Sequence, residues 1–141
     1  MQFRSTLKAI AVAGFGLTLA APAMSQGVAG SYLAARQASI FNDYRAAADY
    51  FARAMMQDTG NPALMENAVM AYLGLGQAER AAAVARRLMS TGASSQIANM
   101  VLLADGIKRE NFDSVLADIE AGQSVGPLID GLLKAWAELG A

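Results

Sequence analysis

The chain has 141 residues, of which 55% are hydrophobic and 16% are charged, with neither cysteine nor histidine in the sequence. A disulfide, a thiolate nucleophile, a zinc site built from Cys and His, and a Ser-His-Asp triad are therefore excluded. The formal net charge of -1 gives no electrostatic reason to expect nucleic acid or an anionic membrane as a partner. The apolar, alanine-rich composition with three prolines argues against disorder and favours one helical domain.

The N-terminus, residues 1–25, has the layout of a secretory signal peptide. Two positive residues, Arg4 and Lys8, precede an uncharged, mostly apolar stretch at 9–21. This stretch is shorter than the roughly 20 residues that a membrane-spanning helix needs. We therefore expect a cleaved signal, and we keep an uncleaved membrane anchor as the alternative.

Cleavage is expected after Ser25, or alternatively after Ala23, where small residues stand at the positions that a signal peptidase reads. Removing the first 25 residues removes two basic residues and no acidic one. The remaining chain then has 9 basic and 12 acidic residues, a net charge of -3. A signal of this style implies a bacterial protein that is exported, with the periplasm as its destination.

The rest of the chain repeats with a spacing of 34 residues. Residues 42–47, 76–81 and 110–115 align at this spacing, and each begins with a polar turn and leads into an amphipathic helix. This period is typical of a helix–turn–helix repeat unit, although an ordinary helical bundle is the alternative. We expect one domain at 28–141, with repeats at about 28–61, 62–95 and 96–129 and a partial fourth from about 130.

Apolar residues within each repeat recur at the three- and four-residue spacings of amphipathic helices. Asn61 with Pro62, either Ser94 or Ser95, and Asn111 are expected at helix N-termini. Glycines after helices favour the left-handed backbone of a C-terminal cap, and they stand at Gly60, Gly92 and Gly122. The expected helices cover residues 29–41, 43–58, 62–74, 77–91, 95–109, 112–121 and 127–139.

In these residues the chain resembles the tetratricopeptide repeat (TPR) family. The family pattern has small and aromatic positions in each helix pair and a closing proline, and the matching residues are Ala35, Ala47, Phe51, Ala54, Tyr72, Ala81, Leu102 and Pro127. Polar or medium-sized residues replace a bulky one at Ser31, Met65 and Asn99, larger residues fill the small site at Val69 and Leu103, and Thr59 and Ala93 replace the proline. The resemblance implies an all-α, right-handed α-solenoid of about three repeats plus a final helix.

The resemblance also implies a function. First helices of such repeats line a concave groove that binds a peptide or a partner helix, so we expect a non-catalytic scaffold, assembly or adaptor module. The groove candidates transferred by the alignment are Tyr32, Arg36, Ile40, Glu66, Asn67, Met70, Leu73, Met100, Ala104 and Ile107. We do not expect a carboxylate clamp, because the third repeat offers only Lys108, at its far end.

An enzyme is not expected. Glu66, Asp105 and Glu110 are acids near first-helix surfaces, but they fall at no catalytic motif spacing and have no histidine partner. A raised pKa at Glu66 or Asp105 would be needed to support catalysis. We expect neither a cofactor nor a metal, a protein or peptide partner rather than nucleic acid, and membrane contact only through the signal peptide before cleavage.

The end of the sequence carries a first helix without a second helix to cover it. Trp136 and Leu139 then have no expected partner, and the ending has little polar surface. We therefore expect that the sequence is a piece of a longer repeat array, and we keep a last helix that acts as a cap as the alternative.

Overall fold

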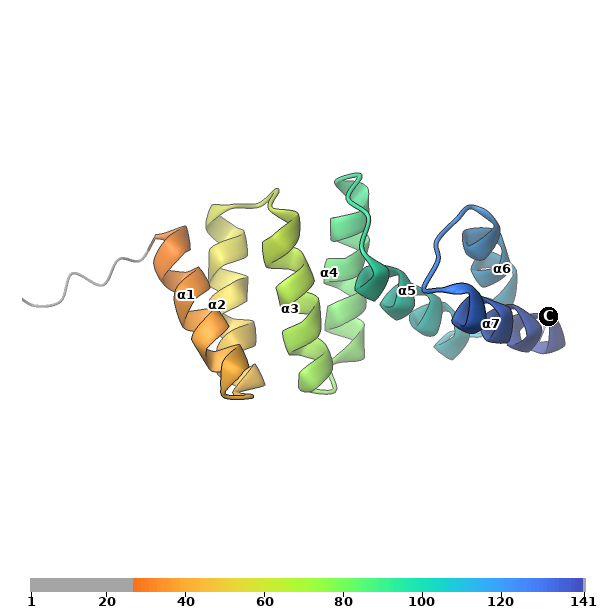
Figure 1. Cartoon of the computed structure of the whole chain (residues 1–141), viewed down its shortest axis with the longest axis horizontal. Coiled ribbons are helices and arrows are strands. Elements are labelled where there is room, and N and C mark those ends of the chain that lie inside the picture. Colours follow the sequence, from red (N-terminus) through yellow and green to blue (C-terminus); the bar gives the residue numbers. More distant parts are fainter. Residues whose placement is uncertain (1–26, 141) are drawn as a thin grey trace, which may run out of the picture.

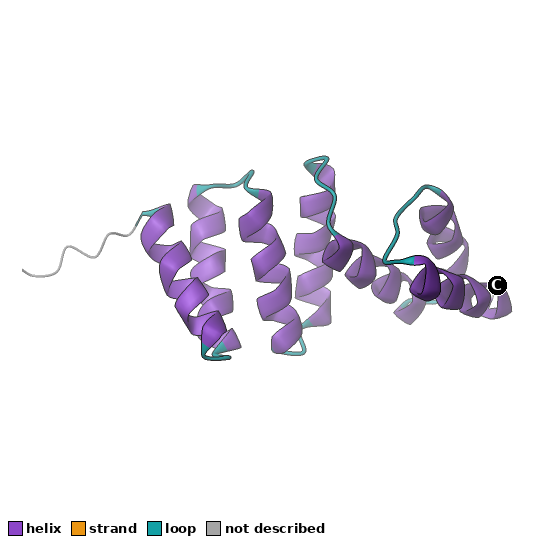
Figure 2. Cartoon of the chain, in the orientation of Figure 1, coloured by secondary structure: helices purple, strands orange, loops and turns teal. Residues whose placement is uncertain are grey.

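The computed structural model describes residues 27–140, and the expected signal peptide lies outside them. Within these residues the chain is all-helical, without a strand (Figure 2). The helices are α1 Val28–Ile40, α2 Tyr44–Gln57, α3 Pro62–Gly74, α4 Ala78–Ser90, α5 Gln96–Lys108, α6 Phe112–Glu120 and α7 Pro127–Gly140. Each expected helix is confirmed, and its ends agree to within one residue.

The helices form an open, solenoid-like row in which each helix packs against the next one in the chain (Figure 1). The odd-numbered helices lie in front in this view and the even-numbered helices behind them. Helices α1 to α4 run side by side, whereas α5 and α7 run across their direction. Consecutive pairs thus pack as in tetratricopeptide-like repeats, which confirms the expected fold class for the described part of the chain.

The start of each second helix follows the 34-residue spacing. Helices α2, α4 and α6 begin at positions 44, 78 and 112. Two residues before each start stands a residue with left-handed backbone, at φ 58° for Asn42, 69° for Gly76 and 59° for Glu110. This conformation costs a residue other than glycine about 1 kcal/mol or more, so its recurrence at Asn42 and Glu110 shows that the same turn is imposed in all three pairs.

The N-terminal caps explain why several helices begin where they do. Asn61 Oδ1 accepts hydrogen bonds from the backbone N–H groups of residues 63 and 64 at 3.1 and 3.4 Å. Ser95 Oγ accepts one from residue 98 at 3.3 Å, so Ser95 rather than its neighbour is the cap. Asp43, which was not expected, caps α2 through residue 46. The cap expected from Asn111 is wrong, because its side chain makes no such bond.

The expectation for glycines after helices is partly confirmed. Gly92 and Gly122 have left-handed backbone, with φ of 79° and 92°. Gly60 does not, and it lies in a link where Asp58 ends α2 and accepts a hydrogen bond from the side chain of Asn61. The side-chain contact stabilises this link without a left-handed residue.

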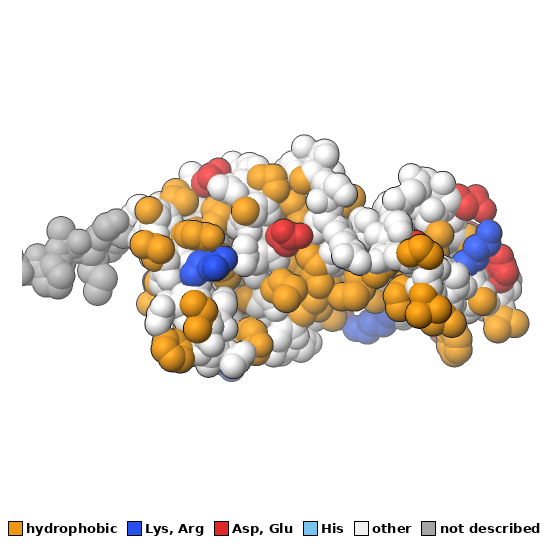
Figure 3. Space-filling view, in the orientation of Figure 1, with side chains coloured by type: hydrophobic (Ala, Val, Ile, Leu, Met, Phe, Trp, Pro, Cys, Tyr) orange, Lys and Arg blue, Asp and Glu red, His pale blue; other side chains and the backbone are white. Residues whose placement is uncertain are grey.

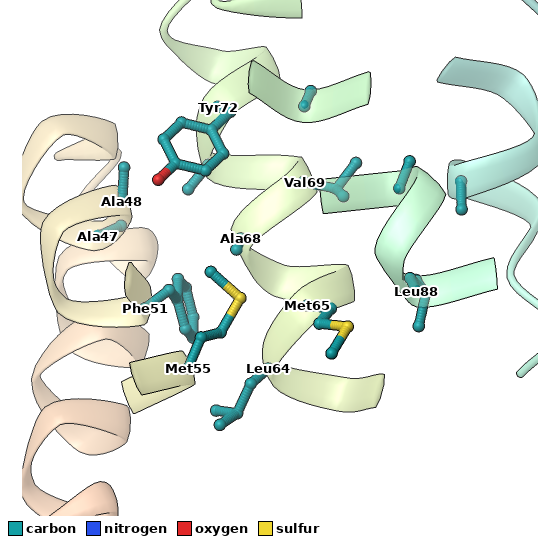
Figure 4. Packing of buried hydrophobic residues seen from close by; sticks show 14 of the residues in the cluster. Ala47, Ala48, Phe51, Met55, Leu64, Met65, Ala68, Val69, Tyr72 and Leu88 are labelled. Atoms are coloured by element: carbon teal, nitrogen blue, oxygen red, sulfur yellow. The ribbon is translucent and has the colours of Figure 1, made fainter. Parts of the chain in front are cut away.

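The main hydrophobic core joins α1 to α4 and the start of α5. Figure 4 shows Phe51 and Met55 of α2 pointing toward Leu64 and Ala68 of α3. Phe51 is fully buried, and alanines around it let the helices approach closely. At some positions where the family has a small or a bulky residue, this chain has another type. All of these residues are nevertheless buried, namely Ser31, Met65, Val69, Asn99 and Leu103.

A second, smaller core forms between α5, α6 and α7 around Leu103, Val115, Val125 and Ala137. Helix α6 ends early, at residue 120, and α7 begins at Pro127, three residues before position 130, which the 34-residue spacing from Gln96 would give. Helix α7 begins at Pro127 because the fixed φ of proline suits the first helical turn.

The link between α6 and α7 is held from both sides. From α5, the side-chain amide of Gln96 donates to the carbonyl of Val125, and that of Asn99 donates to the carbonyl of Ser124 at 2.9 Å. From α7, the carboxylate of Asp130 accepts from Ser124 Oγ and from the N–H groups of Val125 and residue 126. These bonds fix α7 against α5 and α6 although the period is broken.

Candidate functional site

The candidate site is the surface formed by the odd-numbered helices α1, α3, α5 and α7, which we call the first-helix face. All the predicted groove residues lie on α1, α3 or α5, and none of them is fully buried. Residues 34 positions apart occupy equivalent places, so the face contains cross-helix rows. One row is Tyr32, Glu66 and Met100, the next is Arg36, Met70 and Ala104, and Leu73 and Ile107 form the third.

The rows differ in how far they are available to a partner. The ring of Tyr32 packs edge-on against Phe51, with 6.4 Å between ring centroids. Leu73 and Ile107 are also half-buried, against the larger and the smaller core respectively. The available apolar surface of these rows therefore comes mainly from Met70 and Met100, which are 54% and 40% exposed.

Two predicted groove residues, Ile40 and Asn67, lie outside these three rows. Ile40 is 34 positions before Gly74, which faces the preceding helix α2 rather than the open surface. Ile40 therefore lies at the outer edge of α1, where it is 67% exposed. Asn67 donates its side-chain amide to the carbonyl of Ala63 within α3, at 2.7 Å, so part of its hydrogen-bonding capacity is already used.

The face carries few charged groups. Glu66 accepts a hydrogen bond from Ser95 Oγ at 2.6 Å, which ties its carboxylate to the start of α5. Arg36 is exposed and forms no ion pair within residues 27–140. In Figure 3, which views this face, hydrophobic side chains are spread along the whole row, with single charged side chains over α1 and α3 and further charged side chains at the far end of α7. The arrangement suits recognition of a mainly apolar surface with little charge.

Two hollows lie away from the predicted residues. One, of about 390 Å³, is lined by the turn between α3 and α4 and by Lys108. The other, of about 380 Å³, lies between α4, α5 and α6 and includes Arg86, Asp105 and Arg109. Both are lined in part by charged or polar side chains, and no residue predicted for the groove lines either of them.

Asp105 forms the main ion-pair cluster of the described residues. Its Oδ2 lies 3.0 Å from Arg86 Nη1 of α4 and 3.0 Å from Arg109 Nε. Burial by itself would raise the pKa of Asp105, but hydrogen bonds and positive charge from Arg109 and Arg86 outweigh it and lower the pKa below its ordinary value of 3.8. A general acid or base at neutral pH needs the opposite shift, so Asp105 has the properties of a structural carboxylate that joins α4 to α5.

Replacing Asp105 with asparagine should remove part of the acid sensitivity of folding. Because the folded-state pKa is lowered, the charged carboxylate stabilises the fold above pH 3.8, and this contribution is lost as the pH falls through the folded-state pKa. The loss at neutral pH should be about 1 kcal/mol at most, since the arginines are half-exposed and solvent screens the pair. Urea unfolding between pH 7 and pH 3 measures this, with Asp49→Asn, an exposed aspartate, as control. Equal pH dependence in D105N and the unchanged protein would contradict the assignment.

Two further features of the described residues bear on function. Among residues 27–140, no group of three or more acidic side chains is arranged to hold a metal ion. None of the described helices has the length and apolarity to span a membrane.

The comparisons with known proteins agree with the geometry. The family model for the tetratricopeptide repeat matches residues 40–102, which run from the end of α1 into α5. No curated protein and no solved structure matches the chain. The match supports the repeat family for these residues, and members of that family generally mediate protein–protein interactions and are typically non-catalytic.

Proposed function

We propose that this chain, in which residues 40–102 match the tetratricopeptide repeat family, is a non-catalytic scaffold or adaptor that binds a peptide or helix on its first-helix face. The observation that carries this proposal is the combination of an open helix-pair row with exposed apolar side chains on that face. Met70 and Met100 stay accessible although the chain has a well-filled core. Methionine is flexible and polarisable, which suits an adaptable binding surface.

The shape of the fold supports the same function. Each helix pair packs mainly on its neighbours in sequence, so the face is long and is not closed by distant parts of residues 27–140. A helix or an extended segment can contact several first helices at once, which distributes binding energy over repeated positions. Asp105, one of the acids that catalysis would need, has a lowered pKa and two arginine partners, which favours binding over chemistry.

The test is a triple substitution of Tyr32, Arg36 and Met70 by alanine. These side chains lie on two neighbouring first helices, so their loss should weaken partner binding about tenfold or more while the helices remain. Pulldown of partners, with far-UV circular dichroism of the same samples, measures both effects. The matched control is Met56→Ala, an exposed methionine of α2 on a second helix. Unaltered pulldown with unchanged dichroism would refute the use of this face.

We also propose that the protein is exported to the bacterial periplasm after removal of residues 1–25. The support is the sequence layout of its N-terminus. The alternative is an interaction protein that keeps this segment as a membrane tether. Mass spectrometry of the protein recovered from cells separates the two, because cleavage leaves an N-terminus at Gln26 and a tether keeps Met1 in the membrane fraction.

A further inference from the structure

The final helix repeats a contact made by α3, and this contact defines its register. A methyl group added to Gly74 of α3 would lie 2.5 Å from Cγ of Tyr44, the first residue of α2. A methyl group added to Gly140 of α7 would lie 2.6 Å from the ring of Phe112, the first residue of α6. In both places an aromatic ring at the start of a second helix packs onto a glycine near the end of the following first helix. Gly140 is thus the counterpart of Gly74.

This register places a row of large apolar residues of α7 on the first-helix face. Counting back from the two glycines, Leu132, Trp136 and Leu139 are the counterparts of Glu66, Met70 and Leu73. They are 61%, 63% and 86% exposed. From the sequence alone, Trp136 and Leu139 were expected to lack a second helix that covers them. In the structure they lie on the first-helix face.

The other two sides of α7 support this assignment. Ala137, the counterpart of the buried Ala71, is itself fully buried against the smaller core. In α3, Tyr72 lies under the guanidinium of Arg80 of α4, the second helix that follows, and Met65 points toward Leu88 of α4 (Figure 4). The counterparts in α7 are Gly131 and Glu138, which are exposed together with Lys134 between them. That side is small and polar, so the apolar row is not the surface that a following second helix would cover.

The first-helix face therefore has two chemically different ends. At the α1–α3 end it contains Arg36, without an ion pair in the described chain, and Glu66, whose carboxylate is held by Ser95. At the α5–α7 end the same rows contain only apolar side chains, which are Met100, Ala104, Ile107, Leu132, Trp136 and Leu139. Figure 3 shows hydrophobic side chains over α5 and α7, with charged side chains beside them at the far end of the row.

We propose that the α5–α7 end is the main apolar anchor site of the binding face, and that its occupant is a protein segment with large apolar side chains near one end and a carboxylate near the other. The inference rests on the proposed function and names its partner class. Aliphatic or aromatic side chains of the segment bury against Leu132 and Trp136, and the carboxylate pairs with Arg36. Tryptophan in a contact of this kind commonly contributes a large share of binding energy.

Charge decides between this occupant and others. A basic segment would bring a cation to Arg36, the unpaired cation of this end, while the nearby acid Glu66 already has a partner. An acidic, apolar segment satisfies both ends of the face at once.

Trp136 provides a direct reporter, because it is the sole tryptophan of the sequence and is largely exposed. Peptides selected from a random display library on the full protein should combine apolar clusters with Asp or Glu. Synthetic, tryptophan-free versions should shift the emission of Trp136 to shorter wavelength and protect it from acrylamide. Leu132→Ser with Leu139→Ser should weaken binding about tenfold or more. Arg36→Glu should change the selected charge from acidic to basic.

Leu33→Ser is the matched control, since Leu33 is also 65% exposed but lies at the outer edge of α1. One result would overturn the anchor and leave the proposed function intact. In it, peptides bind without a change in Trp136 emission, and the Tyr32, Arg36 and Met70 variant abolishes their binding. A library that yields no binding peptide would overturn both. A dimer in sedimentation that the Leu132 and Leu139 substitutions dissociate, or a Trp136 shift with anionic vesicles alone, would assign the surface to self-association or to lipid and overturn the proposal.

Discussion

Replacing Phe51 with alanine is expected to destabilise the fold by about 3–5 kcal/mol, the range found when a large aromatic side chain leaves a cavity in a packed core. Phe51 is fully buried between α1, α2 and α3, and it also supports the ring of Tyr32 at 6.4 Å. Small domains are stable by only about 5–15 kcal/mol, so this single change removes a large share of the total. Urea unfolding followed by far-UV circular dichroism measures the loss.

Phe41→Ala provides the control for that experiment. Phe41 is the same residue type but is 70% exposed at the end of α1, so its removal should change the free energy of unfolding by less than about 0.5 kcal/mol. Comparable losses for the two substitutions would show that burial in the main core does not determine stability. Because repeats unfold as coupled neighbours, hydrogen exchange should show the loss from Phe51→Ala first in α1 to α3.

Replacing Gly106 with valine should destabilise the packing of α5 on α6 by about 2–3 kcal/mol, because it overfills a closed contact. A Cβ at this position would lie 2.6 Å from Cγ2 of Val115, which is 1% exposed and has little room to move. A branched side chain adds further atoms to the same space. Removal of a helix glycine normally stabilises a helix by a few tenths to 1 kcal/mol, so a net loss identifies the clash.

Gly131→Val is the matched control, because nothing lies within 4 Å of a Cβ at this α7 position. It should be neutral or slightly stabilising. Val115→Ala supplies the second arm, since it removes the atoms that Gly106→Val would meet. The double variant should be less destabilised than the sum of the two single variants, by about 0.5–3 kcal/mol. Additive losses would contradict a direct contact between positions 106 and 115.

The positions of the helices could be predicted because they depend on two features of the sequence, the spacing of apolar residues and the capping residues. Spacing of apolar residues and the caps at Asn61 and Ser95 specify where helices begin, and the 34-residue step repeats this information three times. Asn111 was wrongly expected to cap α6, since a suitable residue type does not ensure that its side chain points at the free N–H groups.

The candidate face was only partly predictable. An alignment at a fixed spacing assigns Arg36, Met70 and Ala104 to one row, but it does not reach α7, which begins three residues early. The register of that helix depends on long-range contacts, namely the ring of Phe112 on Gly140 and the bonds that hold the preceding link. Periodicity carries no information about such contacts, so the apolar row of Trp136 could not be placed from the sequence.

In each repeat the left-handed turn and the starts of the first and second helices recur at the same spacing. This recurrence has a consequence for how the number of repeats changes during evolution. Loss or duplication of one whole unit joins ends with matching chemistry, because Asn61 before α3 and Ser95 before α5 are both capping residues. Recombination within a gene could therefore shorten or extend this stretch without creating an unfamiliar junction. The step from α5 to α7, from residue 96 to 127, lacks this equivalence. Descendants of this chain should therefore vary in unit number before α6 and keep the α6–α7 pair intact.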